Sequence, residues 1–156
     1  MAETTHEPLL LENQLCFPLY ACAKEVVRRY RAPLEPLGLT YTQYIVMMTL
    51  WQHGDMTEGE LGRIIHLDSG TLAPLLKRLE KQALIARQRL AGNERKLLLS
   101  LTERGRALKQ EAEKVPCAME NCIPLEKHEL MQLKTLLTKA ISLMTEKPEH
   151  RTEESA

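Results

Sequence analysis

The sequence has few aromatic residues and no net charge, and neither feature points to a function by itself. Phe, Trp and Tyr make up 4% of the 156 residues, and Lys plus Arg equal Asp plus Glu at 21 each. A neutral chain has no bulk attraction for nucleic acid or for an acidic membrane surface, so a basic binding surface would have to be local. The Leu-, Lys- and Glu-rich remainder favours a mostly helical fold.

Signals for membrane insertion and secretion are also lacking. Apolar runs such as Ile45–Met48 are far too short to cross a bilayer, and the first residues, MAETTHEPLL, lack the basic stretch of a secretory signal. The four cysteines do not have the tight spacing of a disulfide framework; they are Cys16, Cys22, Cys117 and Cys122. We therefore expect a cytoplasmic protein with free thiols and no membrane partner.

Residues 55–102 begin with two short helical patterns separated by a tight turn. Thr57 and Glu60 form a T-x-x-E capping box, which predicts a helix that continues to about Leu67. Asp68 or Ser69 can cap a second helix, whose apolar stripe consists of Leu72, Leu75, Leu76 and Leu79.

A basic β-hairpin is predicted directly after the second helix. Ile85–Leu90 and Lys96–Leu101 are strand-like, and the residues between them, Ala91-Gly92-Asn93-Glu94, favour a tight turn. Helix, turn, helix and basic hairpin is the layout of a winged helix-turn-helix, which lays its second helix in the major groove of DNA.

Positive charge is concentrated in this region. Residues 77–109 contain ten Lys or Arg against three Glu, an excess of seven inside a neutral chain. Such a stripe is typical of a surface that binds double-stranded DNA, although acids elsewhere in space could also compensate it on a solvated surface. The predicted DNA-binding residues are Ser69, Thr71, Lys77, Arg78, Arg87, Arg89, Arg95 and Lys96, with Arg95 reaching the minor groove from the hairpin.

Long helices are predicted on both sides of this unit. Asn13 can cap the first helix, and Pro33, Pro36 and Gly38 should end it. Pro18 should either bend the helix near its start or leave a first turn that is not fully α. The next helix, Tyr41–His53, should have an inner side of Tyr44, Ile45, Met48 and Trp51. After the hairpin, a helix should begin at residue 102 and break at residue 116. The last helix, Leu125–Thr145, has an apolar stripe that is broad for one small domain.

This broad stripe and the long first helix suggest a dimerisation layer. We predict a mainly α fold with a small β-hairpin wing, in a single domain of residues 1–156. Its winged helix-turn-helix would occupy about 41–102, and its dimerisation helices about 10–37 and 103–146. A homodimer would place two recognition helices about 34 Å apart on a pseudo-palindromic operator.

Cys16 lies within the first turn of the first predicted helix, in the segment LENQLCFPLYA. A thiol there is at the positive end of the helix dipole, which stabilises the thiolate. Tyr20, Tyr30 and Tyr41 can donate phenolic hydrogen bonds to that sulfur. A reactive thiol is one interpretation of this position, and a buried, inert cysteine is the other.

Several segments together are similar to one family. LENQLCFPLYA, RRYRAPLEPLGLTYTQY, LDSGTLAPLLKRLE and the NER of the wing resemble the organic-hydroperoxide-sensing OhrR branch of the MarR repressors, over about residues 10–145. The resemblance implies an obligate homodimeric repressor in which Cys16 reacts with organic hydroperoxides. It also implies that Tyr30 and Tyr41 hold the thiolate from the partner subunit, with Tyr20 a weaker candidate.

Two residues depart from the family pattern. Asn93 replaces the Asp that precedes the wing Arg in many relatives, so Arg95 lacks that ionic partner. Ala73 stands where a Thr is common in the recognition helix, which removes a hydroxyl.

The resemblance leaves the fate of the oxidised sulfur open. Some members of the branch close a disulfide between subunits, and others cap the sulfenic acid with a low-molecular-weight thiol. Cys122 falls where a resolving cysteine would belong, and Cys117 is a near competitor.

Three alternatives compete with a redox-sensing repressor. Cys117, Cys122 and His128 could bind zinc, but they lack a fourth ligand and the usual two-residue gap between cysteines. A repressor released by a small aromatic ligand would leave Cys16 without a redox role. A thiol peroxidase would need a cluster of Arg, Thr or Glu around Cys16, which the sequence lacks. We therefore expect no enzyme activity, no metal and no cofactor.

Overall fold

The computed structural model describes residues 9–90 and 92–145, except for the side chains of Glu94 and Arg95. Its contacts divide the chain into two compact units, Met1–Cys122 and Ile123–Ala156, and each unit is described here by itself. The single domain expected from the sequence stays a prediction.

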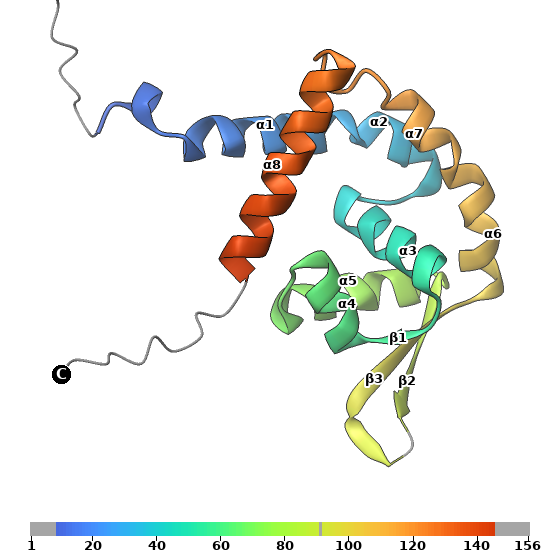
Figure 1. Ribbon diagram of the computed structural model, residues 1–156. Coiled ribbons are helices and arrows are strands. Elements are labelled where there is room, and N and C mark those ends of the chain that lie inside the picture. Colours follow the sequence, from blue (N-terminus) through green and yellow to red (C-terminus); the bar gives the residue numbers. More distant parts are fainter. Residues whose placement is uncertain (1–8, 91, 146–156) are drawn as a thin grey trace, which may run out of the picture. The chain divides into compact units, whose positions relative to one another are not determined.

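The first unit contains seven described α-helices (Figure 1). They are α1 (Cys16–Arg29), α2 (Arg31–Leu34), α3 (Tyr41–His53), α4 (Glu58–Ile65), α5 (Ser69–Lys81), α6 (Glu103–Ala112) and α7 (Lys114–Ala118). Two 3₁₀ turns, η1 (Leu11–Asn13) and η2 (Glu35–Leu37), precede α1 and follow α2. The second unit contains α8 (Lys127–Thr145). This is the mainly helical architecture with a small wing that the sequence predicts.

The wing is a three-stranded antiparallel sheet, although the sequence predicted only its two longer strands. The strands are β1 (Met56–Thr57), β2 (Ile85–Leu90) and β3 (Asn93–Leu101), in the order β1-β3-β2. A strand of two residues is too short to show the alternation that identifies strands in a sequence. Leu90 pairs with Asn93, so a two-residue connection joins β2 to β3, and Gly92 in it has a φ of 85°.

The start of each helix of the helix-turn-helix follows the predicted capping residues. The Glu60 amide donates to the Thr57 hydroxyl at 3.3 Å, and the Thr57 amide donates to the Glu60 carboxylate at 2.8 Å. Asp68 caps α5, because its carboxylate accepts from the Thr71 amide at 2.9 Å. These local bonds satisfy amides that the helix itself leaves unpaired.

One hydrophobic core joins α3, α4, α5 and the wing. Its fully buried side chains include Val46, Met47, Leu50, Leu61, Leu72, Leu76, Leu79, Ile85 and Leu99. The predicted inner side of α3 is partly wrong, because Met48 is 37% exposed while its neighbours Val46 and Met47 are completely buried. Helix α3 is covered by several elements at once, so its buried positions do not follow a single stripe.

The first helix differs from the prediction in three ways. It begins at Cys16 with Leu15 as its N-cap, whereas the predicted cap residue Asn13 belongs to η1. Pro18 lies in the first α-helical turn, where a missing amide removes no bond of the helix, so the expected distortion is absent there. The helix ends at Arg29, and the chain continues into the short α2. In the described part of the chain, no helix has the length and apolar character to cross a membrane.

Candidate functional site

Helix α5 presents a polar surface outward and buries its apolar stripe. Leu72, Leu76 and Leu79 are buried, while Lys77 and Arg78 on the other side are exposed. Ser69 and Thr71 are exposed at its N-terminus, and the Thr71 hydroxyl donates to the Asp68 carboxylate at 2.9 Å. Hydrogen bonds from Thr71, first from its amide and then from its hydroxyl, lower the pKa of Asp68, so the cap is ionised near neutral pH.

An ion pair joins α5 to the wing. The Arg87 guanidinium on β2 donates to one Glu80 carboxylate oxygen from both Nη2, at 2.6 Å, and Nε, at 2.9 Å. The Arg87 side chain is only 18% exposed, so its guanidinium is mostly engaged by Glu80 and largely shielded from solvent. The predicted DNA contact of Arg87 would compete with this pair, and we expect its main effect to be holding the wing against α5.

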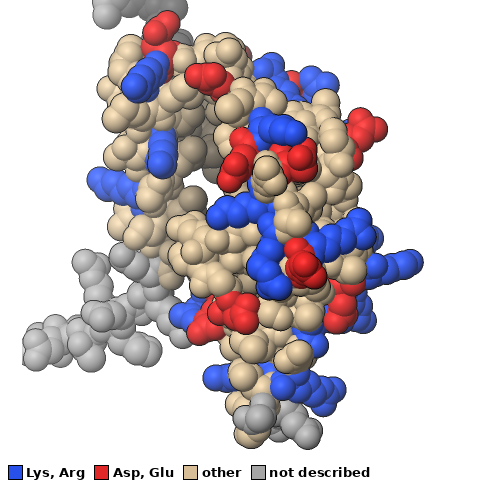
Figure 2. Space-filling model, turned by 90° about the vertical axis from the view of Figure 1, so that its right-hand side faces the viewer, with Lys and Arg blue, Asp and Glu red and all other residues tan. Residues whose placement is uncertain are grey.

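Basic side chains also lie along the wing. Arg89 and Lys96 are exposed on β2 and β3, while the Arg95 side chain lies outside the described residues. Figure 2 shows Lys and Arg on both sides of the wing at the bottom of the view. The surface formed by α5 and the wing, called here the α5–wing surface, therefore combines a projecting helix with exposed positive charge.

Cys16 is exposed at the first position of α1 in this unit. The helix leaves many apolar side chains uncovered, including Leu15 at 78% exposure and Tyr20 at 61%. Cys16 and Tyr30 lie at opposite ends of α1, and 14 residues of helix separate them by about 21 Å. Within one chain, the structure therefore does not bring Cys16 to Tyr30 or Tyr41.

Tyr30 and Tyr41 instead contact each other and Tyr44, which the sequence predicted only as part of the inner side of its helix. The ring centroids of Tyr30 and Tyr41 are 4.5 Å apart, and those of Tyr30 and Tyr44 are 6.1 Å apart. Tyr44 is one helical turn after Tyr41, and this spacing was the available signal. Burial is the main cause that raises the pKa of all three phenols, so they stay protonated and able to donate hydrogen bonds.

Cys122 lies beside these tyrosines. Of the four cysteines, all of which the structure describes, Cys122 alone acts electrostatically on Tyr30 and Tyr41, and it adds to the rise of their pKa values. Cys122 is partly buried, whereas Cys117 is exposed. We call Tyr30, Tyr41, Tyr44 and Cys122 the tyrosine–cysteine cluster. Within the described ranges, no three His, Cys, Asp or Glu side chains are grouped in a way that could hold a metal ion.

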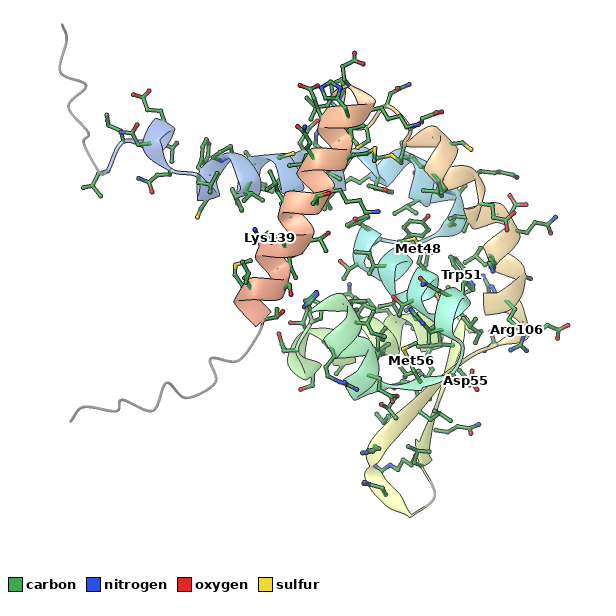
Figure 3. All side chains as sticks on the ribbon, viewed as in Figure 1. Met48, Trp51, Asp55, Met56, Arg106 and Lys139 are labelled. Atoms are coloured by element: carbon green, nitrogen blue, oxygen red, sulfur yellow. The ribbon has the colours of Figure 1, made fainter. Side chains whose placement is uncertain are left out.

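A separate pocket of about 350 Å³ opens between α3, α6 and α7. Met48 and Trp51 lie on the side of α3 that faces α6 (Figure 3). The Trp51 indole donates to the Gly105 carbonyl at 2.8 Å. The pocket is lined by Tyr44, Met48, Trp51, Gln52, Lys109, Ala112, Glu113 and Pro116.

Comparisons with known proteins identify relatives of this chain. Residues 29–112 match the family model of the transcriptional regulators SarA/Rot. The organic hydroperoxide resistance transcriptional regulator of Bacillus subtilis is 40% identical over 145 residues, which cover 93% of this chain and 99% of that protein. These relatives are named as transcriptional regulators.

Solved structures that resemble this chain are also transcriptional regulators. AbfR of Staphylococcus epidermidis, reduced and bound to DNA, is 34% identical with a TM-score of 0.74 over 89% of this chain and 95% of its own. Disulfide-formed AbfR is 36% identical with a TM-score of 0.60 over 84% and 92%. A mutant MarR from E. coli with operator DNA shares the fold, with a TM-score of 0.73 at 22% identity over 89% and 99%. The chain belongs to the MarR family of winged-helix transcriptional regulators, in the branch of the organic hydroperoxide resistance regulators (OhrR).

Proposed function

We infer that this protein is a DNA-binding repressor that senses organic hydroperoxides by oxidation of Cys16 and then releases its operator. The observation that carries the inference is that the chain has both an exposed Cys16 at a helix start and, elsewhere, the tyrosine–cysteine cluster. Phenols that stay protonated can donate hydrogen bonds to a thiolate, and a nearby thiol can resolve a sulfenic acid. The protein would act in the cytoplasm, and no catalytic turnover is needed for the switch.

Cys16 and the tyrosine–cysteine cluster would meet across the interface of a homodimer. Exposed apolar side chains on α1 and, in the second unit, on α8 support an interface between two copies. In such a dimer, Cys16 of one subunit would approach Tyr30 and Tyr41 of the other, with Tyr20 a weaker candidate on the same helix as Cys16. The separation of about 21 Å along α1 rules out the same encounter within one α1 helix and its own Tyr30.

The chemistry requires one hydroperoxide molecule per oxidation. The Cys16 thiolate attacks a peroxide oxygen, so an S–O bond forms, the O–O bond breaks, and the organic fragment takes a proton and leaves as an alcohol. The Cys122 thiol then attacks the sulfenic sulfur; an S–S bond forms, and hydroxide leaves with the thiol proton as water. A low-molecular-weight thiol could take the same place as Cys122.

The direct experiment is a gel shift with the DNA upstream of the protein's own gene. The reduced protein should shift this DNA, an organic hydroperoxide should abolish the shift, and dithiothreitol should restore it. Binding that does not respond to hydroperoxide would contradict the proposed switch.

The first prediction concerns the α5–wing surface. Replacing Arg78 by Ala should weaken operator binding and reduce the slope of log affinity against log salt concentration by about 0.9 per lost phosphate contact in each subunit. Lys114→Ala is a matched control, because Lys114 at the start of α7 pairs with Glu111 of α6 at 2.6 Å and belongs to neither α5 nor the wing. Identical slopes for the wild type and Arg78→Ala would remove Arg78 from the DNA contacts.

The second prediction concerns the tyrosines. Tyr30→Phe and Tyr41→Phe each remove a donor that favours the charged sulfur, so alkylation and peroxide oxidation of Cys16 should slow by about threefold to tenfold. Operator binding by the reduced protein should change little. Tyr44→Phe is the control, since Tyr44 lies in the same cluster beside Tyr30 but is not proposed to donate to Cys16. Equal slowing in all three variants would assign the effect to packing.

The third prediction concerns the resolving thiol. Organic hydroperoxide should produce a reducible dimer on non-reducing gels, and Cys122→Ser should abolish it, because serine has no sulfur with which to form a disulfide to Cys16. Cys122→Ser should carry a small-thiol adduct or over-oxidised sulfur on Cys16 instead. A dimer band that survives this change but disappears in Cys117→Ser would transfer the role to Cys117.

A second candidate function is supported by the pocket between α3, α6 and α7. Its aromatic and aliphatic lining, with Trp51 and Met48 on one wall, could accept a small aromatic ligand that releases DNA without oxidation. Ligand-dependent release from Cys16→Ser protein, with no response to hydroperoxide in the wild type, would favour this candidate.

A further inference from the structure

Arg29 links the backbone of Cys122 to the end of α1. Its Nη1 donates to the Cys122 carbonyl oxygen at 2.6 Å, across 93 residues of sequence. Hydrogen bonds with a charged donor are shorter and stronger than neutral ones, and this contact is a short one. The contact therefore holds the segment that carries Cys122 next to the residue that precedes Tyr30.

The guanidinium is itself held in place. Its Nε donates to a Glu25 carboxylate oxygen at 3.1 Å, one turn back along α1. Arg28 binds the same carboxylate from Nε at 2.8 Å and Nη2 at 2.7 Å. Glu25 thus fixes two arginines, but only Arg29 has a described bond to Cys122.

The ionic part of this arrangement persists at the pH of a cell. Hydrogen bonds from Arg28 and then Arg29 lower the pKa of Glu25 from 4.5 to about 2. A lowered pKa means that the carboxylate contributes stability above pH 4.5 and loses this contribution as the pH falls toward 2. Acidification within the physiological range leaves the charges unchanged.

The described backbone hydrogen bonds of the Cys122 segment are local, while Met119 in the same turn packs against the hydrophobic core. The Cys122 amide donates to the Met119 carbonyl at 2.9 Å, and the Glu120 amide donates to the Cys117 carbonyl at 3.3 Å, so the segment is a local turn after α7. These bonds shape the turn, but they do not attach it to α1. The bond from Arg29 attaches the turn to α1 through the Cys122 backbone carbonyl, so the Cys122 sulfur takes no part in the attachment.

We propose that Arg29, braced by Glu25, is a positioning residue that keeps Cys122 beside Tyr30 and Tyr41, ready to capture the sulfenic acid of the partner's sensing cysteine. The proposal rests on the proposed function. Capture competes with a second hydroperoxide, which would convert the sulfenic acid to sulfinic acid and release another alcohol. A tethered Cys122 favours capture, because its effective concentration near the sulfenic sulfur is higher than that of a free segment.

The test compares Arg29→Ala with Arg28→Ala in the full-length reduced protein. Cumene hydroperoxide serves as the oxidant. Loss of the Cys16 thiol is followed by quenched alkylation, disulfide by non-reducing gels, and sulfinic acid by mass spectrometry. Arg29→Ala should oxidise Cys16 at the wild-type rate, form the disulfide about threefold to tenfold more slowly, and accumulate more sulfinic acid. Arg28→Ala should match the wild type in all three readouts.

Hydrogen exchange separates a local effect from unfolding. Exchange at residues 117–122 should accelerate in Arg29→Ala, while α3 stays as protected as in the wild type. Equal acceleration in α3, or equal disulfide rates in Arg29→Ala and Arg28→Ala, would overturn the role of Arg29 alone. A wild type that forms no disulfide at all would overturn the resolving role of Cys122 in the proposed function, and the capture role of Arg29 with it.

Discussion

Cys16→Ser protein should bind operator DNA as tightly as the wild type and should stay bound after treatment with organic hydroperoxide. Serine keeps the size and the position of the side chain at the start of α1, but its hydroxyl cannot form a sulfenic acid. Because Cys16 is exposed, the substitution removes no core contact, and the fold should be unaffected. The whole peroxide response should therefore disappear while the DNA-binding activity remains.

The expected loss of operator affinity depends on the coupling between Cys16 and the DNA-binding surface. Coupling free energies of allosteric proteins correspond to affinity changes of about 5-fold to 150-fold, and we expect oxidation of the wild type to weaken operator binding within this range. Fluorescence anisotropy with labelled operator, before and after cumene hydroperoxide, measures it. Cys22→Ser is the matched control, since Cys22 is an exposed thiol on the same helix and its loss should leave the response intact. Release of DNA from oxidised Cys16→Ser would transfer sensing to another residue.

Gly105→Ala should destabilise the protein by about 1–3 kcal/mol or more, although it adds only a methyl group. A Cβ at residue 105 would lie 2.0 Å from the Leu84 carbonyl oxygen, and this neighbour is backbone that cannot rotate away. That carbonyl accepts the Thr102 amide at 3.1 Å. The Thr102 hydroxyl in turn accepts the Gly105 amide at 3.0 Å and donates to the Ala83 carbonyl at 2.6 Å. Any shift that accommodates the methyl group would disturb this whole junction between the wing and α6.

Urea unfolding measures the loss of stability in Gly105→Ala. The protein concentration must be fixed, because dimerisation would make stability depend on it. Gly59→Ala is the control. Gly59 is in α4, and a Cβ added there would lie in open space. The free energy of unfolding should therefore stay within about 1 kcal/mol of the wild type. Equal midpoints for Gly105→Ala and Gly59→Ala would mean that the Leu84 backbone moves more easily than the structure implies.

The features that the sequence predicted best depend on residues close together in the chain. The capping residues Thr57 and Asp68 act over three residues, so their patterns are visible without tertiary information. The prediction that Asn13 caps the first helix was wrong, because the chain before α1 forms η1 and the helix begins three residues later. Local patterns show that a helix can begin, but competing local structure decides where.

The features that the sequence could not predict are contacts between distant segments. Burial of Met47 instead of Met48 depends on which elements surround α3, and β1 exists only because β3 pairs with it. In the candidate site, the sequence predicted roles for Cys16, Tyr30, Tyr41 and Cys122, but it did not predict the bond from Arg29. Arginine–carbonyl contacts have no sequence pattern, because almost any exposed carbonyl can accept one.

Trp51 gives the molecule a built-in optical reporter. It is the chain's only tryptophan, it is partly buried, and its indole hydrogen bond ends on Gly105, at the start of the helix that leaves the wing. Indole emission depends on the polarity and hydrogen bonding around the ring, so a change at the contact between α3 and α6 should alter the wavelength or intensity of the emitted light. Stopped-flow mixing of unlabelled protein with a hydroperoxide can therefore time the movement of this junction separately from the chemistry at sulfur, and the delay between them measures how fast an oxidised thiol is translated into a changed DNA-binding unit.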